Sequence, residues 1–249
     1  MKPLADFESK LIVVTGAAGG IGRECVDLLL ATVLASSPSI ATLPRCRPCR
    51  PRASAMPAGQ GWRQWCPGLE SPAACAAAIG KVDAPIFALL HLAGIFEADE
   101  IDAQSRPVWD RAIAVNLTSA FDITGACLPH LVTDEAARLV FMASVAYRRG
   151  SFDHIGYSAA KGGIAAMVRA MSRRLGPRAM VNAVAPGIIR TAMAQDIIDS
   201  RADALLNTIP VARFGHPREV AGVVKFLCSA DASYITGQVI NCDGGIANG

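Results

Sequence analysis

The feature that most constrains the fold is a short apolar run near the N-terminus that ends in glycines. Residues 11–22 read LIVVTGAAGGIG, and apolar residues recur near a period of 3.6 in the following segment, 20–34. The β-branched run predicts a strand buried on both faces, and the periodic segment predicts a helix. A strand, a glycine turn and a helix in this order favour an α/β fold.

The same alternation continues to the end of the chain. Further strands are expected over apolar runs, at 86–94, 137–143, 180–185 and in GQVINCDGG. Helices are expected between them, at 107–131, 157–175 and 217–229, with Ser71 and Pro72 starting another as N-cap and first residue. Strands that alternate with helices predict right-handed crossovers and a parallel sheet covered on both faces. We therefore expect one Rossmann-type, doubly wound α/β domain over residues 1–249.

Composition limits the classes of partner and the cellular compartment that we expect for this domain. Hydrophobic residues make up 52% of the chain and charged residues 18%, so a sizeable core is expected. The net charge of +3 is no global nucleic-acid signature, and no stretch reaches the length of apolar residues that a membrane span needs. The N-terminus MKPLADFESK lacks the apolar region of a secretory signal, which favours a cytoplasmic protein with reduced cysteines.

The glycine loop TGAAGGIG predicts a phosphate site. Gly16 permits a tight turn, Gly20 lets the backbone approach a pyrophosphate, and Gly22 allows close packing of the helix. The free N–H groups and positive dipole at the helix N-terminus favour phosphate binding. The alternative is a glycine-rich turn of an α/β fold that binds nothing.

A tyrosine and a lysine in YSAAK indicate acid–base chemistry. Tyr157 and Lys161 are four residues apart, so they share one face of the predicted helix. An ammonium near a phenol favours the phenolate and is expected to lower the tyrosine pKa. Ser144 directly follows a predicted strand, at the edge of a parallel sheet where ligands bind. Its hydroxyl could hydrogen-bond a substrate carbonyl.

Together these motifs resemble the short-chain dehydrogenase/reductase family. TGAAGGIG, Ser144, YSAAK and the PG of 186–187 occur in the family's order, and Asn116 in AVNLTSAF matches its catalytic asparagine. The segment from VARFGHPREV to INCDGG resembles the bacterial 3-oxoacyl reductase-like and polyol dehydrogenase-like branch. The likeness covers residues 8–246 apart from the stretch PRCRPCRPR at residues 44–52.

The resemblance implies an oxidoreductase that moves hydride between a nicotinamide cofactor and a secondary alcohol or ketone. Tyr157 would be the general acid or base, Lys161 would assist it and hold the nicotinamide ribose, Ser144 would polarise the carbonyl, and Asn116 would anchor a water. It also implies a homodimer or homotetramer through helices 107–131 and 157–175. The residues expected at the cofactor are Gly16, Gly20, Ile21, Gly22, Ala93, Gly94, Tyr157, Lys161, Pro186, Gly187, Ile189 and Thr191.

Two departures concern histidines. The family's NNAG is HLAG here, at residues 91–94, and we interpret His91 as a structural substitute for an asparagine that ties neighbouring strands. His154, three residues before Tyr157, could touch substrate or be solvated.

The larger departure is residues 35–68. This segment has five prolines between residues 38 and 57, no long apolar run and no acid. Prolines argue against a central strand. An acid at the end of the second strand would bind the ribose hydroxyls of NAD, and none is present.

Four interpretations of the basic run PRCRPCRPR (44–52) stay open. It could join a four-thiolate metal site, bind nucleic acid together with nearby tryptophans, or offer an arginine to the 2′-phosphate of NADP. We favour a fourth, an irregular segment that has lost the family pattern, for instance through a translational frame change. We therefore expect no metal and no nucleic-acid partner. The residues concerned are Cys46, Cys49, Cys66, Cys75, Trp62 and Trp65.

The cofactor and the substrate are left undecided by these motifs. A glycine loop without a basic residue favours NAD, and the missing acid favours NADP. Tyr147, Arg148, Arg149 and Phe152 suggest a pocket for a polar or anionic group, and a 3-oxoacyl thioester is the favoured small-molecule substrate. The rival hypothesis is a catalytically silent dinucleotide-binding scaffold. Neither a metal nor a membrane partner is expected.

Overall fold

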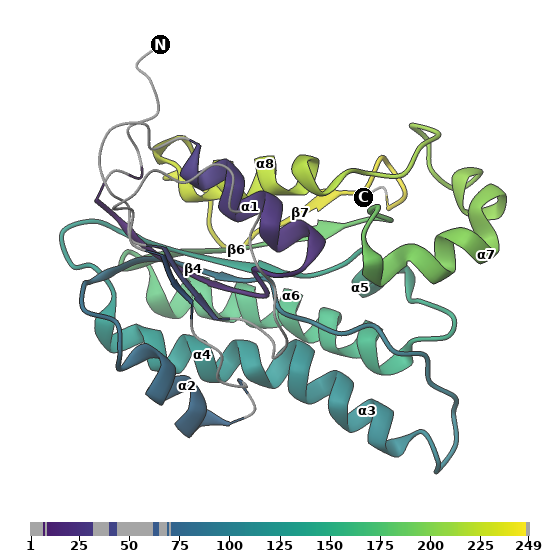
Figure 1. The fold of residues 1–249 in the computed structure, drawn as a ribbon, viewed down its shortest axis with the longest axis horizontal. Coiled ribbons are helices and arrows are strands. Elements are labelled where there is room, and N and C mark those ends of the chain that lie inside the picture. Colours follow the sequence, from purple (N-terminus) through teal and green to yellow (C-terminus); the bar gives the residue numbers. More distant parts are fainter. Residues whose placement is uncertain are drawn as a thin grey trace.

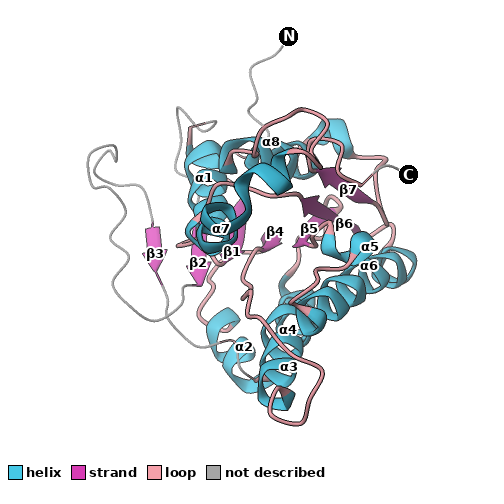
Figure 2. Cartoon of the chain, turned by 90° about the vertical axis from the view of Figure 1, so that its right-hand side faces the viewer, coloured by secondary structure: helices cyan, strands magenta, loops and turns pink. Residues whose placement is uncertain are grey.

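The structure is a computed structural model, and it describes residues 7, 9–31, 40–43, 62–64, 69 and 71–247. Seven parallel strands form one sheet in the order β3-β2-β1-β4-β5-β6-β7, which Figure 2 shows nearly end-on. The strands are β1 (Leu11–Thr15), β2 (Ile40–Leu43), β3 (Trp62–Gln64), β4 (Ile86–His91), β5 (Ala137–Met142), β6 (Ala179–Pro186) and β7 (Val239–Cys242). This topology confirms the predicted doubly wound α/β fold, because the strand order reverses direction at β1.

Helices cover both faces of the sheet (Figure 1). α1 (Gly20–Leu30) and α8 (Pro217–Cys228) pack together on one face. The other face carries α2 (Pro72–Ile79), α3 (Arg106–Ile113), α4 (Ser119–Cys127) and α6 (Ile155–Leu175). Two further helices, α5 (Ala146–Arg149) and α7 (Gln195–Leu206), lie at the carboxyl ends of the strands. The predicted cap of α2 is present, because the Ser71 hydroxyl accepts a hydrogen bond from the Ala74 N–H.

The core consists of two apolar layers on either side of the sheet. β4 and β5 are buried along their whole length, as continuous apolar runs in a central parallel strand require. Leu90 and Val140 face α1 and α8, whereas Leu89 and Leu139 face α2, α4 and α6. The alternation of side chains along each strand therefore supplies both layers.

The expectation that prolines exclude a central strand from residues 35–68 is wrong for one short stretch, because β2 lies between β1 and the edge strand β3. Residues 40–43 pair with β1, and residues 62–64 extend the sheet beyond them. The four residues of β2 lie between Pro38 and Pro44, so no proline occupies a ladder position. A proline-rich segment can therefore contribute a strand when the strand is short enough to fit between prolines.

The predicted helix 107–131 is interrupted. It runs as α3, a π-helical turn over Ala114–Thr118, α4 and a 3-10 turn over Leu128–His130. Among the described residues, this run is the one helix that is long and apolar enough to cross a membrane. Its apolar residues Ala120, Ile123 and Cys127 are completely buried against the sheet, so its composition is that of a core helix.

Candidate functional site

The glycine loop between β1 and α1 has the shape of a phosphate cradle. Gly16 has φ of 70°, and a Cβ there would come within 2.6 Å of the Ala93 nitrogen. A Cβ at Gly22 would come within 2.2 Å of the Gly16 carbonyl oxygen. Only glycine fits both positions, and the result is an open backbone leading into the first turn of α1. N–H groups in that turn have no intrahelical acceptor, so the loop fits the pyrophosphate of a dinucleotide.

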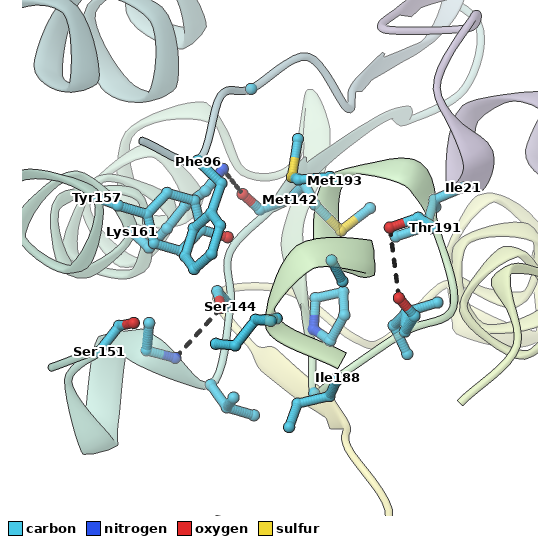
Figure 3. A pocket seen from close by; sticks show the side chains of 18 of the residues that line it. Ile21, Phe96, Met142, Ser144, Ser151, Tyr157, Lys161, Ile188, Thr191 and Met193 are labelled. Atoms are coloured by element: carbon cyan, nitrogen blue, oxygen red, sulfur yellow. Dashed lines mark hydrogen bonds between the residues drawn. The ribbon is translucent and has the colours of Figure 1, made fainter. Parts of the chain in front are cut away.

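The loop opens into a cavity of about 680 Å³ at the carboxyl edge of the sheet (Figure 3). The four predicted catalytic residues, Asn116, Ser144, Tyr157 and Lys161, all line this cavity. So do the predicted cofactor residues except Ala93, whose N–H donates to the Thr15 hydroxyl behind the loop. The lining cofactor residues are Gly16, Gly20, Ile21, Gly22, Gly94, Pro186, Gly187, Ile189 and Thr191.

Lys161 is buried beside the tyrosine. Its Nζ donates to the Met142 carbonyl at 2.9 Å, at the end of β5, and lies 5.5 Å from the centre of the Tyr157 ring. Burial lowers the pKa of Lys161 to about 8, because the ammonium has lost its water. The lysine therefore titrates close to neutral pH, and it points toward the same space as the tyrosine (Figure 3).

The pKa of Tyr157 differs from the expectation. Burial raises it, and a hydrogen bond with the Ser144 side chain opposes that rise. We expected Lys161 to lower the pKa, but in this structure its ammonium bonds the Met142 carbonyl and the serine is the group that favours the phenolate. At neutral pH the phenol is protonated and can donate a proton.

Asn116 lies in the π-helical turn and holds the segment that follows β4. Its Oδ1 accepts from the Ile95 N–H at 3.1 Å, and its Nδ2 donates to the Ile95 and Ala112 carbonyls. The side chain is buried, and both of its amide hydrogens are used by backbone carbonyls. It therefore fixes the floor of the cavity next to Lys161 and Gly94.

His91 is a structural tie, as we interpreted it. The Ser119 hydroxyl donates to the Val115 carbonyl, so it accepts from His91 Nε2, and the Thr15 hydroxyl then donates to Nδ1 at 3.0 Å. The imidazole thus joins β1, β4 and α4. Burial, with the nearby Lys161 charge, lowers the pKa of His91 to about 3, so the ring is neutral. A neutral ring suits this pattern of donors and acceptors.

An aromatic stack beside Tyr157 could not be recognised from the sequence. The Phe96 ring lies flat on His154, with centroids 3.6 Å apart, and its edge meets Tyr157 at 4.9 Å. Asp99 anchors this wall, because its carboxylate accepts from the Ile155 and Gly156 N–H groups at the start of α6. His154 is buried in the stack and therefore is not simply solvated.

A second feature that no sequence motif indicates is an ion pair at the cavity mouth. Arg201 of α7 bonds Asp153 at 3.0 Å, and both residues line the cavity. Arg149 and Phe152 also line it, whereas Tyr147 and Arg148 do not. A motif search would miss this pair, because Asp153 lies in the turn before α6, Arg201 lies in α7, and the two meet only in the fold.

The whole basic run lies outside the described part of the chain, namely residues 44–52 with Cys46 and Cys49. Trp65 and Cys66 lie outside it as well, so the metal, nucleic-acid and arginine interpretations of that run are not tested. Cys75 is buried in the core on α2. Within the described ranges, no group of three or more His, Cys, Asp or Glu side chains could hold a metal ion.

A dinucleotide cradle that shares one cavity with a tyrosine, a buried lysine and a serine hydroxyl defines a nicotinamide-dependent oxidoreductase. The family model described as enoyl-(acyl carrier protein) reductase matches residues 70–247. The 3-oxoacyl-(acyl-carrier-protein) reductase FabG of Vibrio harveyi is 32% identical over 250 residues, which cover 97% of this chain and 98% of the relative. The chain belongs to the short-chain dehydrogenase/reductase family, and it acts with a nicotinamide cofactor on a small-molecule carbonyl or alcohol.

Solved structures agree with this assignment. A glucose/ribitol dehydrogenase-type member of the family from Brucella melitensis superposes with a TM-score of 0.88 at 32% identity, over 98% of this chain and 99% of that one. A putative 2-deoxy-D-gluconate 3-dehydrogenase from Agrobacterium tumefaciens with bound NADP gives 0.83 at 27% identity, over 99% of both chains. The shared fold includes the strand edge at which the cavity opens.

Proposed function

We propose that this protein reduces the 3-keto group of an acyl thioester with NADPH. The observation that carries the proposal is the meeting of Tyr157, Ser144 and Lys161 in the cavity that the glycine loop enters. The printed activity of the Vibrio harveyi relative, a 3-oxoacyl-(acyl-carrier-protein) reductase, supports the choice of substrate. The reaction adds a hydride to the carbonyl carbon and a proton to its oxygen.

In this proposal each site residue has one role. The nicotinamide, when bound, supplies the hydride. Tyr157 donates the proton to the carbonyl oxygen, which its raised pKa favours because the phenol is protonated at neutral pH. Ser144, whose side chain bonds the tyrosine in this structure, would turn its hydroxyl to the substrate and donate a hydrogen bond that polarises the carbonyl. The Lys161 ammonium stabilises the phenolate that remains and holds the nicotinamide ribose.

The remaining site residues bind the cofactor and water. We place the pyrophosphate against Gly16, Gly20, Ile21 and Gly22, at the N-terminus of α1. Asn116 would anchor a water that returns a proton to the tyrosine through Lys161. Ala93 and Gly94 would hold the adenosine ribose, and the segment 186–191 would hold the carboxamide. The residues of that segment that would contact the cofactor are Pro186, Gly187, Ile189 and Thr191.

We propose NADP rather than NAD as the cofactor. No Asp or Glu occurs between Asp27 and Glu70, so no acid from this stretch can bind the ribose hydroxyls. Arg23 lines the cavity, and its Nε donates to the Ala18 carbonyl at 2.9 Å. This bond holds an exposed guanidinium against the glycine loop, in place of the basic loop residue that the sequence lacks. The bound NADP in the Agrobacterium tumefaciens neighbour is consistent with this choice.

The same proposal includes the domain organisation, the compartment and the oligomeric state of the enzyme. We propose that residues 1–249 act as one domain in the cytoplasm. Dimers or tetramers would form through the helical run 106–130 and α6. Phe121, on α4, leaves 64% of its surface exposed, which a partner helix would cover. The expected partner molecules are small substrates, and neither nucleic acid nor a membrane is needed.

One experiment tests the proposed function. Purified protein is mixed with acetoacetyl-N-acetylcysteamine, a small 3-oxoacyl thioester, and NADPH oxidation is followed by absorbance. We expect turnover with NADPH and much slower turnover with NADH. Turnover of an aldohexose or a polyol with no reduction of the thioester would refute the choice of substrate, and faster turnover with NADH would refute the choice of cofactor.

A further inference from the structure

The substrate half of the cavity combines an apolar interior with a charged mouth. Phe96, Val145, Ile188, Ile197 and Leu205 line the interior. Beyond Lys161 at the reaction centre and Arg23 at the glycine loop, the described charged residues that line the cavity are Arg149, Asp153 and Arg201. A substrate that fits this lining has an apolar body, and any charge it carries stays at the mouth.

The ion pair between Arg201 and Asp153 is weak enough for another anion to replace the aspartate. Only one contact joins Arg201 Nη2 to Asp153 Oδ2, at 3.0 Å, and the two side chains are 53% and 36% exposed. Such a pair contributes little stability in water, because solvent screens it. Arg201 also has a non-helical backbone, with φ of −140° and ψ of 24°, which breaks α7 at this residue. An incoming anion can therefore replace the aspartate without unfolding a regular helix.

Arg149 adds a second cation without a second acid. It ends α5, is exposed, and its guanidinium has no ion-pair partner among the described residues. The neighbouring Arg148 is different, because its Nε donates to the Tyr147 hydroxyl at 2.7 Å and it does not line the cavity. The mouth thus presents two guanidiniums against one carboxylate, an excess of one positive charge. Exposed Phe152 and Met193 flank these charges with apolar surface.

We infer that Arg149 and Arg201 bind the phosphate of a phosphopantetheine arm, and that Asp153 holds Arg201 until the phosphate takes its place. The inference rests on the proposed thioester substrate. A short keto acid would have to carry its carboxylate into the apolar interior, which is costly. A thioester on a pantetheine arm instead leaves its phosphate outside, where guanidiniums recognise phosphate well. The same arm carries acyl groups on coenzyme A and on carrier proteins.

The test compares two thioesters that differ by one phosphate, with a keto acid as a third probe. Acetoacetyl-4′-phosphopantetheine, acetoacetyl-pantetheine and acetoacetate are titrated calorimetrically into the full chain with NADP⁺ present. We expect the phosphorylated thioester to bind about fivefold more tightly than the neutral one, the range of an exposed charge contact. This preference should shrink at high salt, since the charges are exposed.

Variants assign the preference to residues. Arg149→Gln and Arg201→Gln should each bring the ratio of the two Kd values toward one and leave the neutral thioester unchanged, whereas Arg201→Lys should retain most of the preference. Arg148→Gln is the matched control on the same short helix and should change nothing. Asp153→Asn removes the competitor for Arg201, so it should strengthen binding of the phosphorylated thioester, and a weakening would contradict the exchange.

The outcomes separate this inference from the proposed function. Equal binding of both thioesters by the wild-type chain overturns the inference, and so does arginine-dependent binding of acetoacetate. Binding of neither thioester overturns it as well. Turnover with NADPH is measured on the same preparations with the neutral thioester. A phosphate preference without turnover would leave the inference standing and refute the reductase activity, and turnover without a preference would do the reverse.

Discussion

The β5–β6 side of the sheet and the β2–β3 edge differ in strand length, in burial and in how closely their sequences match the family. β5 pairs with β6 over six residues, and both strands are almost wholly buried. At the other edge, β2 pairs with β1 over four residues and β3 pairs with β2 over three. The family model matches residues 70–247, which include the four catalytic candidates and exclude the glycine loop, β2 and β3. The reaction side thus keeps the family pattern, and the adenosine side departs from it.

This difference separates two functions of the site. In the proposed function, hydride and proton transfer depend on groups at the ends of β5 and β6 and at the start of α6, which a fully packed core positions. Recognition of the adenosine would depend on the short edge strands and on exposed residues such as Arg23. Changes on the adenosine side can therefore alter cofactor affinity without moving the catalytic groups, and substitutions on each side should produce different kinetic signatures.

The largest effect is expected on the reaction side. Tyr157→Phe removes the proton donor and should lower kcat on the order of a thousandfold, while the Kd of NADPH changes little. Stopped-flow turnover and nicotinamide fluorescence measure the two quantities. Tyr147→Phe is the matched control, because Tyr147 bonds Arg148 outside the cavity and its loss should leave kcat unchanged. Near-normal kcat in Tyr157→Phe would mean that the proton comes from another group.

The parts of the site that could be predicted from the sequence are those that depend on neighbouring residues in the chain. The glycine loop and the Tyr157–Lys161 pair were predictable because they depend on local geometry, a turn and one face of a helix. Arg201 and Phe96 were not, since each acts through a residue distant in the chain, Asp153 and His154. β2 was missed because its place depends on pairing with β1 and not on an apolar run of its own.

The second prediction concerns the tie that holds the reaction side to β1. Burial lowers the pKa of His91 to about 3. As the pH falls below about 6.5, His91 is therefore protonated in the unfolded chain and stays neutral in the folded chain. The unfolding free energy should therefore drop by ~3 kcal/mol between pH 6.5 and pH 4 through this residue. His91→Asn can keep a donor and an acceptor without titrating, so it should remove that part of the loss.

Urea unfolding at several pH values measures this dependence. His130→Asn, at an exposed position, is the control and should keep the wild-type slope. An unchanged acid dependence in His91→Asn would show that the ring is not the group that links acid to unfolding. A loss of stability at neutral pH alone would instead reflect poorer packing between β1, β4 and α4.

The third prediction tests whether the aromatic wall positions the catalytic phenol. Phe96→Leu removes the edge contact with Tyr157 and the stack on His154, and contacts of this kind are worth ~1 kcal/mol. We expect kcat to fall by roughly fivefold, with the Kd of NADPH unchanged and full recovery in Phe96→Tyr. A pH profile of kcat separates positioning from folding: a displaced phenol should shift the alkaline limb, whereas a general loss of stability should leave it in place.

The smallest effect is expected on the adenosine side, and it decides how far the two sides are independent. Arg23→Gln removes an exposed guanidinium held by the Ala18 carbonyl, so it should weaken NADPH binding by roughly threefold and NADH binding very little, with kcat at saturating NADPH unchanged. Arg218→Gln is the control, because Arg218 pairs with the neighbouring Glu24 at 3.9 Å and does not line the cavity. Equal weakening of both cofactors would make Arg23 a support of the loop instead of a phosphate ligand. A fall in kcat would show that the two sides are coupled, because the loop and the catalytic groups line one cavity.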